Sequence, residues 1–141
     1  MNGHGPHPHP TQALLDVYTI EREMGKLDGI KVTLVGDLAN GRTVCSLAYL
    51  LSNYKDVKIY FVSPDVVKMK PDLYEEARGK YIVDKGVLDA MQQHAVVTHP
   101  LPRLNEITVD VDADPRAAYF RQAKNGLSIR IALLKLLLIG C

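Results

Sequence analysis

A strand, a helix and a second strand follow one another in the first half of the chain, and this order restricts the sheet that can form. Residues 31–35 are a short run of apolar and β-branched side chains, typical of a buried strand, and residues 57–62 are another. Between them, apolar side chains recur every three or four residues from Val44 to Tyr54, as on one face of a helix. Strands connected through a helix pair in parallel with a right-handed crossover, so the sequence predicts an α/β fold.

Helical and extended segments continue on both sides of this unit. An apolar stripe from Ala13 to Leu27 predicts a first helix that begins near Pro10. Short strands are expected at 81–83 and 95–98, with a helix between them that Asp84 caps. We therefore expect a small parallel sheet of about four strands with helices on both faces.

The last third of the chain is expected to hold two helices. Asp114 followed by Pro115 is typical of a helix start, and Asn125-Gly126 is expected to kink or end that helix. Residues 127–139 then form a final helix that is apolar nearly all round. Such a helix belongs in a core or against another domain, so we expect part of its surface to lack a partner.

Composition excludes several classes of partner. The chain has 141 residues with 17 Lys+Arg against 16 Asp+Glu, a net charge of +1, so neither a nucleic acid nor an anionic membrane surface is indicated. Lys135 interrupts the most apolar run, which falls short of the roughly 20 residues of a membrane span. Residues 1–8 are rich in Gly, His and Pro and predict a flexible tail without the apolar core of a secretory signal.

The loop 36–43 is the first candidate site, because it follows a strand and opens a helix. Its spacing is that of a phosphate-binding loop, but Arg42 stands at the usual Lys position and Asp37 would oppose an anion. The alternatives are a plain tight turn and a site in which Arg42, at a helix N-terminus, binds an anionic group. Ligands of open α/β sheets bind beyond the carboxyl ends of strands, which fits the last alternative.

Two further segments are candidate binding elements. Residues 99–102, His-Pro-Leu-Pro, follow a predicted strand, and their prolines stiffen a loop that can present the Leu101 carbonyl to a ligand. The alternative is that this loop is a rigid connector without a binding role. His9 and Gln12 lie at a helix start, where an imidazole and an amide can hydrogen-bond a carbonyl and an amide of a ligand.

Metal sites and a reactive thiol are not favoured. The histidines of the first nine residues lie in a Gly/Pro-rich tail, and their spacing alone is weak support for a metal. Asp110, Asp112 and Asp114 imitate the start of a calcium loop but lack its glycine and its closing Glu, so a solvated loop is the better interpretation. Cys45 has no visible His–Asp pair and is expected to be a buried structural cysteine.

Four segments in this order resemble aspartate carbamoyltransferases, most closely plant enzymes: His9-Pro-Thr-Gln-Ala-Leu-Leu-Asp16, Val35-Gly-Asp-Leu-Ala-Asn-Gly-Arg-Thr43, His99-Pro-Leu-Pro-Arg103 and Asp114-Pro-Arg-Ala-Ala-Tyr-Phe-Arg-Gln122. The ornithine-specific relatives typically carry Cys where this chain has Pro100, which favours the aspartate branch. The resemblance implies that residues 9–141 are the aspartate-binding domain of the carbamoyltransferase fold, partial and internally shortened near residues 70–71.

The resemblance also implies a reaction, in which carbamoyl phosphate and L-aspartate give N-carbamoyl-L-aspartate and phosphate. This is an early step of pyrimidine (UMP) synthesis, carried out by a homotrimer that in plants resides in plastids. By resemblance, His9 hydrogen-bonds the carbonyl oxygen of carbamoyl phosphate, Gln12 binds its amide and Arg42 holds an aspartate carboxylate. The Leu101 carbonyl and Pro102 would orient the reacting amide. Catalysis would use positioning and electrostatics, with His9 and Arg42 as the catalytic residues and no metal or cofactor.

The departures from the family are as informative as the match. The family's N-terminal domain, its Ser-Thr-Arg-Thr phosphate loop and the Ser and Lys that a neighbouring subunit supplies do not occur in these residues. Between Lys70 and Pro71 the family has further helix and strand, with a Thr-Arg-x-Gln-type segment that binds aspartate. We therefore expect the chain alone to be inactive. The rival hypothesis is an inactive truncated fragment, or an interaction module that associates with full-length subunits through residues 127–139.

Overall fold

The computed structural model describes residues 10–36, 38, 42–63 and 81–139. Its first half runs through helix α1 (Pro10–Met24), strand β1 (Lys31–Val35), helix α2 (Arg42–Leu51) and strand β2 (Lys58–Val62). The strands pair in parallel, in register from Lys31 opposite Lys58 to Val35 opposite Val62. The predicted strand–helix–strand unit and the α/β class are therefore confirmed. The predicted tail at 1–8 and the shortening near 70–71 lie outside the described residues.

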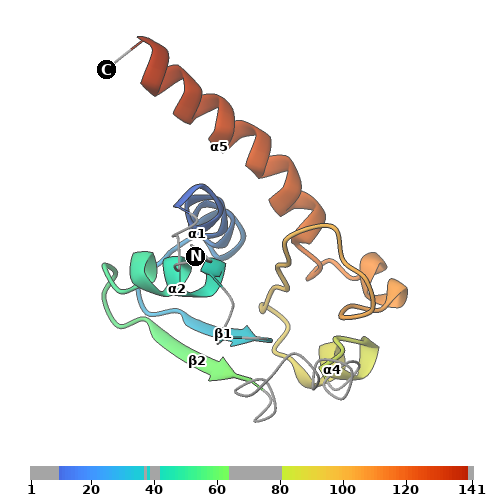
Figure 1. The fold of residues 1–141 in the computed structure, drawn as a ribbon. Helices are drawn as coiled ribbons and strands as arrows, with labels where there is room; N and C mark the ends of the chain where they lie inside the picture. The colour runs from blue at the N-terminus through green and yellow to red at the C-terminus, as the bar shows by residue number, and fades with distance from the viewer. Residues whose placement is uncertain (1–9, 37, 39–41, 64–80, 140–141) are drawn as a thin grey trace, which may run out of the picture.

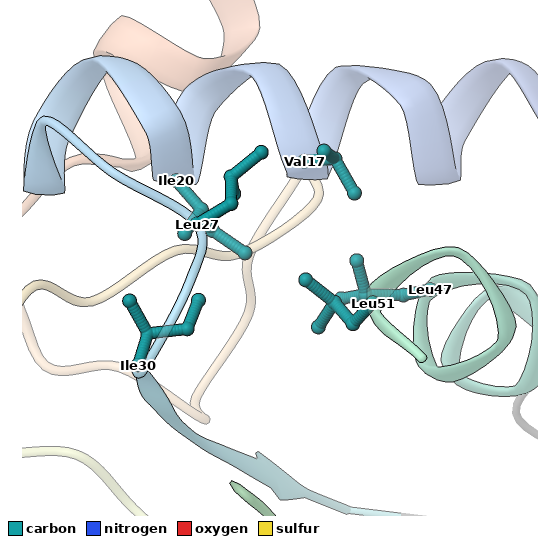
Figure 2. Close-up of a cluster of buried hydrophobic side chains, with 6 residues drawn as sticks. All are labelled: Val17, Ile20, Leu27, Ile30, Leu47 and Leu51. Atoms are coloured by element: carbon teal, nitrogen blue, oxygen red, sulfur yellow. The ribbon is translucent and has the colours of Figure 1, made fainter. Parts of the chain in front are cut away.

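Helices α1 and α2 lie on the same face of this sheet, and a cluster of buried aliphatic side chains fills the space between them (Figures 1 and 2). The buried members come from both helices and from the segment that leads into β1: Val17, Ile20, Leu27, Ile30, Leu47 and Leu51. The alternate side chains of the strands, such as Val32 and Ile59, pack against this cluster. The period of two along a strand directs these residues to one face.

The opposite face of the sheet is uncovered among the described residues. Val35, Tyr60 and Val62 point to that side in the strand alternation, and all three are exposed. Helices on both faces were expected, but the described helices next to the sheet cover one face only.

The second half of the chain forms less sheet than the sequence predicted. The segments expected as strands at 81–83 and 95–98 each make one isolated parallel bridge, Val83 with Ile107 and Val97 with Ala117. The sheet of the described residues has two strands, so the expectation of about four is wrong for this part of the chain. Asp84 begins a helix directly after the first bridge, and Pro100, which lacks an N–H, follows the second.

A second core lies under these bridges. It contains Leu88 from helix α4 (Lys85–Ala90), Val111 from the 3₁₀ helix η3 (Val109–Ala113), and the completely buried Tyr119. Asp84 caps α4 as predicted, since its side chain accepts a hydrogen bond of 2.9 Å from the Val87 N–H.

Helix α5 (Tyr119–Ile139) is one continuous helix of 21 residues, which corrects two expectations. Asp114 does not cap it, because the Asp114 carboxylate binds the backbone N–H and guanidinium of Arg116. Asn125-Gly126 does not break it either. Gly126 is buried, and a Cβ there would lie 3.2 Å from Leu15 Cδ2, so the missing side chain lets α1 approach α5 closely.

The far end of α5 extends away from the rest of the molecule (Figure 1). Leu137, Leu138 and Ile139 are 80%, 82% and 75% exposed, whereas the buried residues of the helix belong to its first eight positions. The expected apolar surface without a partner is thus present among the described residues. No helix in the described ranges is long and apolar enough to cross a membrane.

We expect the 141-residue chain to self-associate through the exposed end of α5. Burial of each exposed Leu or Ile is worth about 1.5–3 kcal/mol, and several such residues together are comparable with the stability of a domain. The double substitution Leu137→Glu with Leu138→Glu should shift the chain toward monomer in sedimentation velocity experiments. Lys124→Glu changes the charge of the same helix by the same amount without removing apolar surface and should leave association unchanged. A wild-type chain that sediments as a monomer up to high concentration would contradict the expectation.

Candidate functional site

The sequence places its candidate binding residues in three segments: the start of α1, the turn between β1 and α2, and the loop 99–102. Gly36 follows β1 with φ of 130°, a conformation that favours glycine, and its N–H donates to the Val62 carbonyl at 3.0 Å. Arg42 is the first residue of α2. Its side chain and the whole of His9 lie outside the described residues, so their predicted roles stay predictions.

Gln12 lies in the first turn of α1 and is partly buried. Its side-chain Nε2 donates a hydrogen bond of 2.7 Å to Oδ1 of Asp16, four residues further along the same helix. Residues four apart share one face of a helix, which is why this pair can form.

The loop 99–102 is held to α5 at its first residue. The backbone N–H of His99 donates to Oε1 of Gln122 at 2.8 Å. The loop then passes through Pro100, Leu101 and Pro102, with a cis peptide between the last two. Leu101 is 39% exposed, so the loop that carries its carbonyl lies at the surface.

One buried carboxylate connects these two segments. Asp16 Oδ1 also accepts a hydrogen bond of 2.7 Å from Nε2 of Gln122. The structure therefore joins Gln12, Asp16, Gln122 and the His99 N–H in series by three hydrogen bonds, which we call the amide relay. It brings the start of α1 and the start of the loop 99–102 together, although they are far apart in sequence.

Asp16 is 8% exposed and Gln122 is 2% exposed, so the amide relay lies almost entirely inside the protein. Burial raises the pKa of Asp16, and the hydrogen bonds from Gln122 and Gln12 oppose that shift. Sequence reasoning did not single out either residue. The Gln12–Asp16 spacing was a usable signal, but nothing local indicated Gln122.

Charged groups near the loop serve its own structure. The ring of His99 lies 3.6 Å from Glu106, and burial lowers the His99 pKa against the opposing effect of that carboxylate. Arg103 donates to the Ile107 carbonyl and to Asp112, both at 2.5 Å. These contacts fix the chain directly after Pro102.

The aspartates that imitated a calcium loop have other partners. Asp112 accepts hydrogen bonds from Arg103 and from the Tyr119 hydroxyl, and burial together with Asp112 raises the pKa of Tyr119 to about 12. Asp114 accepts hydrogen bonds from Arg116, and this contact lowers the pKa of Asp114 to about 2. Among the described residues, no group of three or more His, Cys, Asp or Glu side chains could hold a metal ion. Cys45 is exposed, so its expected burial is wrong.

Comparison with known proteins identifies the relatives of this chain. The family model for the aspartate/ornithine carbamoyltransferase Asp/Orn binding domain matches residues 74–137. Aspartate carbamoyltransferase 3, chloroplastic, from Pisum sativum is 62% identical over 98% of this chain and 46% of its own length. The chloroplastic enzyme of Arabidopsis thaliana is 60% identical, with the same coverage.

Solved structures agree with these relatives. The catalytic subunit of M. jannaschii aspartate transcarbamoylase superposes with a TM-score of 0.83 and 36% identity, covering 96% of this chain and 57% of that one. The Trypanosoma cruzi enzyme in complex with N-(phosphonacetyl)-L-aspartic acid gives a TM-score of 0.79 and 36% identity, covering 92% and 54%.

Two length relations follow from the alignments. The chain spans about half the length of the curated relatives that it matches. The alignment with the pea enzyme runs over 181 positions against 141 residues here, so the relative has at least 40 aligned positions that this chain does not fill. The location of the shortening near residues 70–71 stays a prediction. Over nearly all of its own length, this chain is homologous to the aspartate carbamoyltransferases, which confirms the resemblance that its four sequence motifs indicated.

Proposed function

We propose that the chain provides the aspartate-binding part of an aspartate carbamoyltransferase, a transferase that forms N-carbamoyl-L-aspartate and phosphate from carbamoyl phosphate and L-aspartate. The observation that carries the proposal is the amide relay, which brings Gln12 and the loop of Leu101 together. Both were expected to contact the carbamoyl amide. The relatives support the same activity by name, and the T. cruzi enzyme was solved with carbamoyl aspartate and phosphate.

The proposed mechanism uses positioning and electrostatics. The amine of aspartate attacks the carbonyl carbon of carbamoyl phosphate, and negative charge develops on the carbonyl oxygen. The C–O bond to phosphate then breaks, and the leaving phosphate takes up the proton that the amine loses. His9 donates a hydrogen bond to that oxygen, and the guanidinium of Arg42 holds an aspartate carboxylate. Gln12, the Leu101 carbonyl and Pro102 orient the amide so that the carbonyl carbon faces the amine.

The cellular setting is part of the proposal. The reaction supplies carbamoyl aspartate for pyrimidine (UMP) synthesis, and the plant relatives are named chloroplastic, which supports a plastid location. We propose a homotrimer as the working assembly. These relatives favour a carbamoyltransferase over the rival idea of an interaction module.

The first test is ligand selectivity of the 141-residue chain. We expect N-carbamoyl-L-aspartate to bind more tightly than citrulline, the corresponding ornithine product, in isothermal titration calorimetry. Arg42→Ala should weaken binding of carbamoyl aspartate by about 10–100-fold, the loss expected when a charged hydrogen bond of about 1.5–3 kcal/mol is removed. Arg130→Ala removes an exposed arginine of α5 and should have no effect. A chain that binds neither ligand, or citrulline equally well, would overturn the proposal.

The second test is activity without the family's other domain. The chain incubated with carbamoyl phosphate and L-aspartate should form no carbamoyl aspartate above a control without enzyme. The physical reason is that the phosphate-binding loop expected from the family does not occur in these 141 residues. Product above that control would contradict the expectation, and in that case Arg42→Ala should abolish its formation.

A further inference from the structure

The orientation of one side-chain amide decides what kind of group it recognises. The oxygen of a glutamine side chain accepts hydrogen bonds and its nitrogen donates them, so a rotated amide selects the opposite ligand group. In this chain, the partners of Gln12 and Gln122 determine which way both amides face.

The orientation of the Gln122 amide is set at the loop 99–102. The backbone N–H of His99 can only donate, so the Gln122 amide must turn its oxygen toward it, at 2.8 Å. The Gln122 nitrogen then faces Asp16, where it donates at 2.7 Å. Gln122 is 2% exposed, so water does not reach its amide. Turning the amide around would therefore leave buried polar groups without a hydrogen bond.

The Asp16 carboxylate sets the orientation of the Gln12 amide. An ionised carboxylate only accepts, so the Gln12 amide must offer its nitrogen to Asp16, at 2.7 Å. Among the described residues, none donates to its oxygen. An oxygen in that position accepts from an NH₂ group and offers nothing to a methyl group.

We propose that Asp16 and Gln122 are positioning residues that hold the Gln12 amide with its oxygen toward the ligand, and that this polarity selects a carbamoyl group over an isosteric acetyl group. The inference rests on the proposed function, because it assumes that Gln12 meets the carbamoyl end of the ligand. It goes beyond that function by assigning two residues that touch no substrate to the recognition of the NH₂ group. The amide relay also holds His99, two residues before Leu101. The Leu101 carbonyl, which is the second expected acceptor of that NH₂, is therefore positioned through the same buried carboxylate.

Two ligands that differ only at the group in question test the proposal. N-carbamoyl-L-aspartate carries an NH₂ where N-acetyl-L-aspartate carries a methyl group. We expect the wild-type chain to prefer the carbamoyl ligand by about fivefold or more in calorimetric titrations, the ratio that corresponds to one net hydrogen bond. Asp16→Leu removes the acceptor that orients the Gln12 amide and should bring the preference close to one. Gln122→Met removes the second hydrogen bond that holds the Asp16 carboxylate in place and should lower the preference.

Matched variants separate positioning from stability. Asp16→Asn keeps an acceptor oxygen for both amides and should retain the preference. Thr19→Val removes the acceptor of the neighbouring buried hydrogen bond between the same helices, which Asn125 donates at 3.2 Å, and should also retain it. A purely structural role would weaken both ligands alike and leave their ratio unchanged. As a second readout without ligand, the NH₂ protons of Gln12 should exchange faster with water in the Asp16→Leu variant than in the wild type.

The outcomes are distinguishable. An unchanged carbamoyl preference in whichever of Asp16→Leu and Gln122→Met remains folded overturns the positioning role and leaves the proposed function standing. Equal binding of both ligands by the wild type likewise overturns it. A wild-type chain that binds neither ligand overturns the proposed function, and the positioning role with it. Loss of the preference in the relay variants, with retention in Asp16→Asn and Thr19→Val, supports the inference.

Discussion

The buried contact between α1 and α5 is the interaction on which the rest of the structure depends. Two hydrogen bonds between side chains 106 residues apart, Gln122 to Asp16 and Asn125 to Thr19, cross this contact one helical turn from each other. Gly126 lets the two helices approach, and Arg121 binds Glu23 at the surface. The first half of the chain has its core under α1 and α2, and the second has its own under α4, so the polar contact joins two separate apolar cores.

A polar contact of this kind specifies geometry more strictly than an apolar one. A buried carboxylate is costly unless it is paired, and Asp16 is paired by two amides that have few other partners available. A shift of α5 along α1 by one residue would leave these groups unsatisfied, whereas aliphatic side chains would tolerate some sliding. The positions of Gln12 and of the loop 99–102 follow from that strictness, because both end the same series of hydrogen bonds.

The elements predicted correctly are those whose signals are local. The strand–helix–strand unit and the Asp84 cap could be read from periodicity and capping within a few residues. The strands expected at 81–83 and 95–98 depend on partners elsewhere in the chain, and each finds one residue pair only. Asn125-Gly126 looked like a helix break, but Gly126 lies inside α5 and packs closely against the distant Leu15. The site divides in the same way. Gln12 and Leu101 were predicted from features of their own segments, a helix start and a proline-rich loop, and from motif resemblance, whereas Gln122 was missed because its partner lies 106 residues away.

Helix α5 carries both the relay and the unpartnered apolar surface. Gln122 lies in its first turn and is buried, while Leu137 and Leu138 lie near its other end and are exposed. A helix of 21 residues is about 30 Å long, so the buried polar contact and the exposed leucines lie far apart on one element. The first turns of α5 are therefore held by specific hydrogen bonds to α1, whereas its far end presents apolar surface that the described residues leave uncovered.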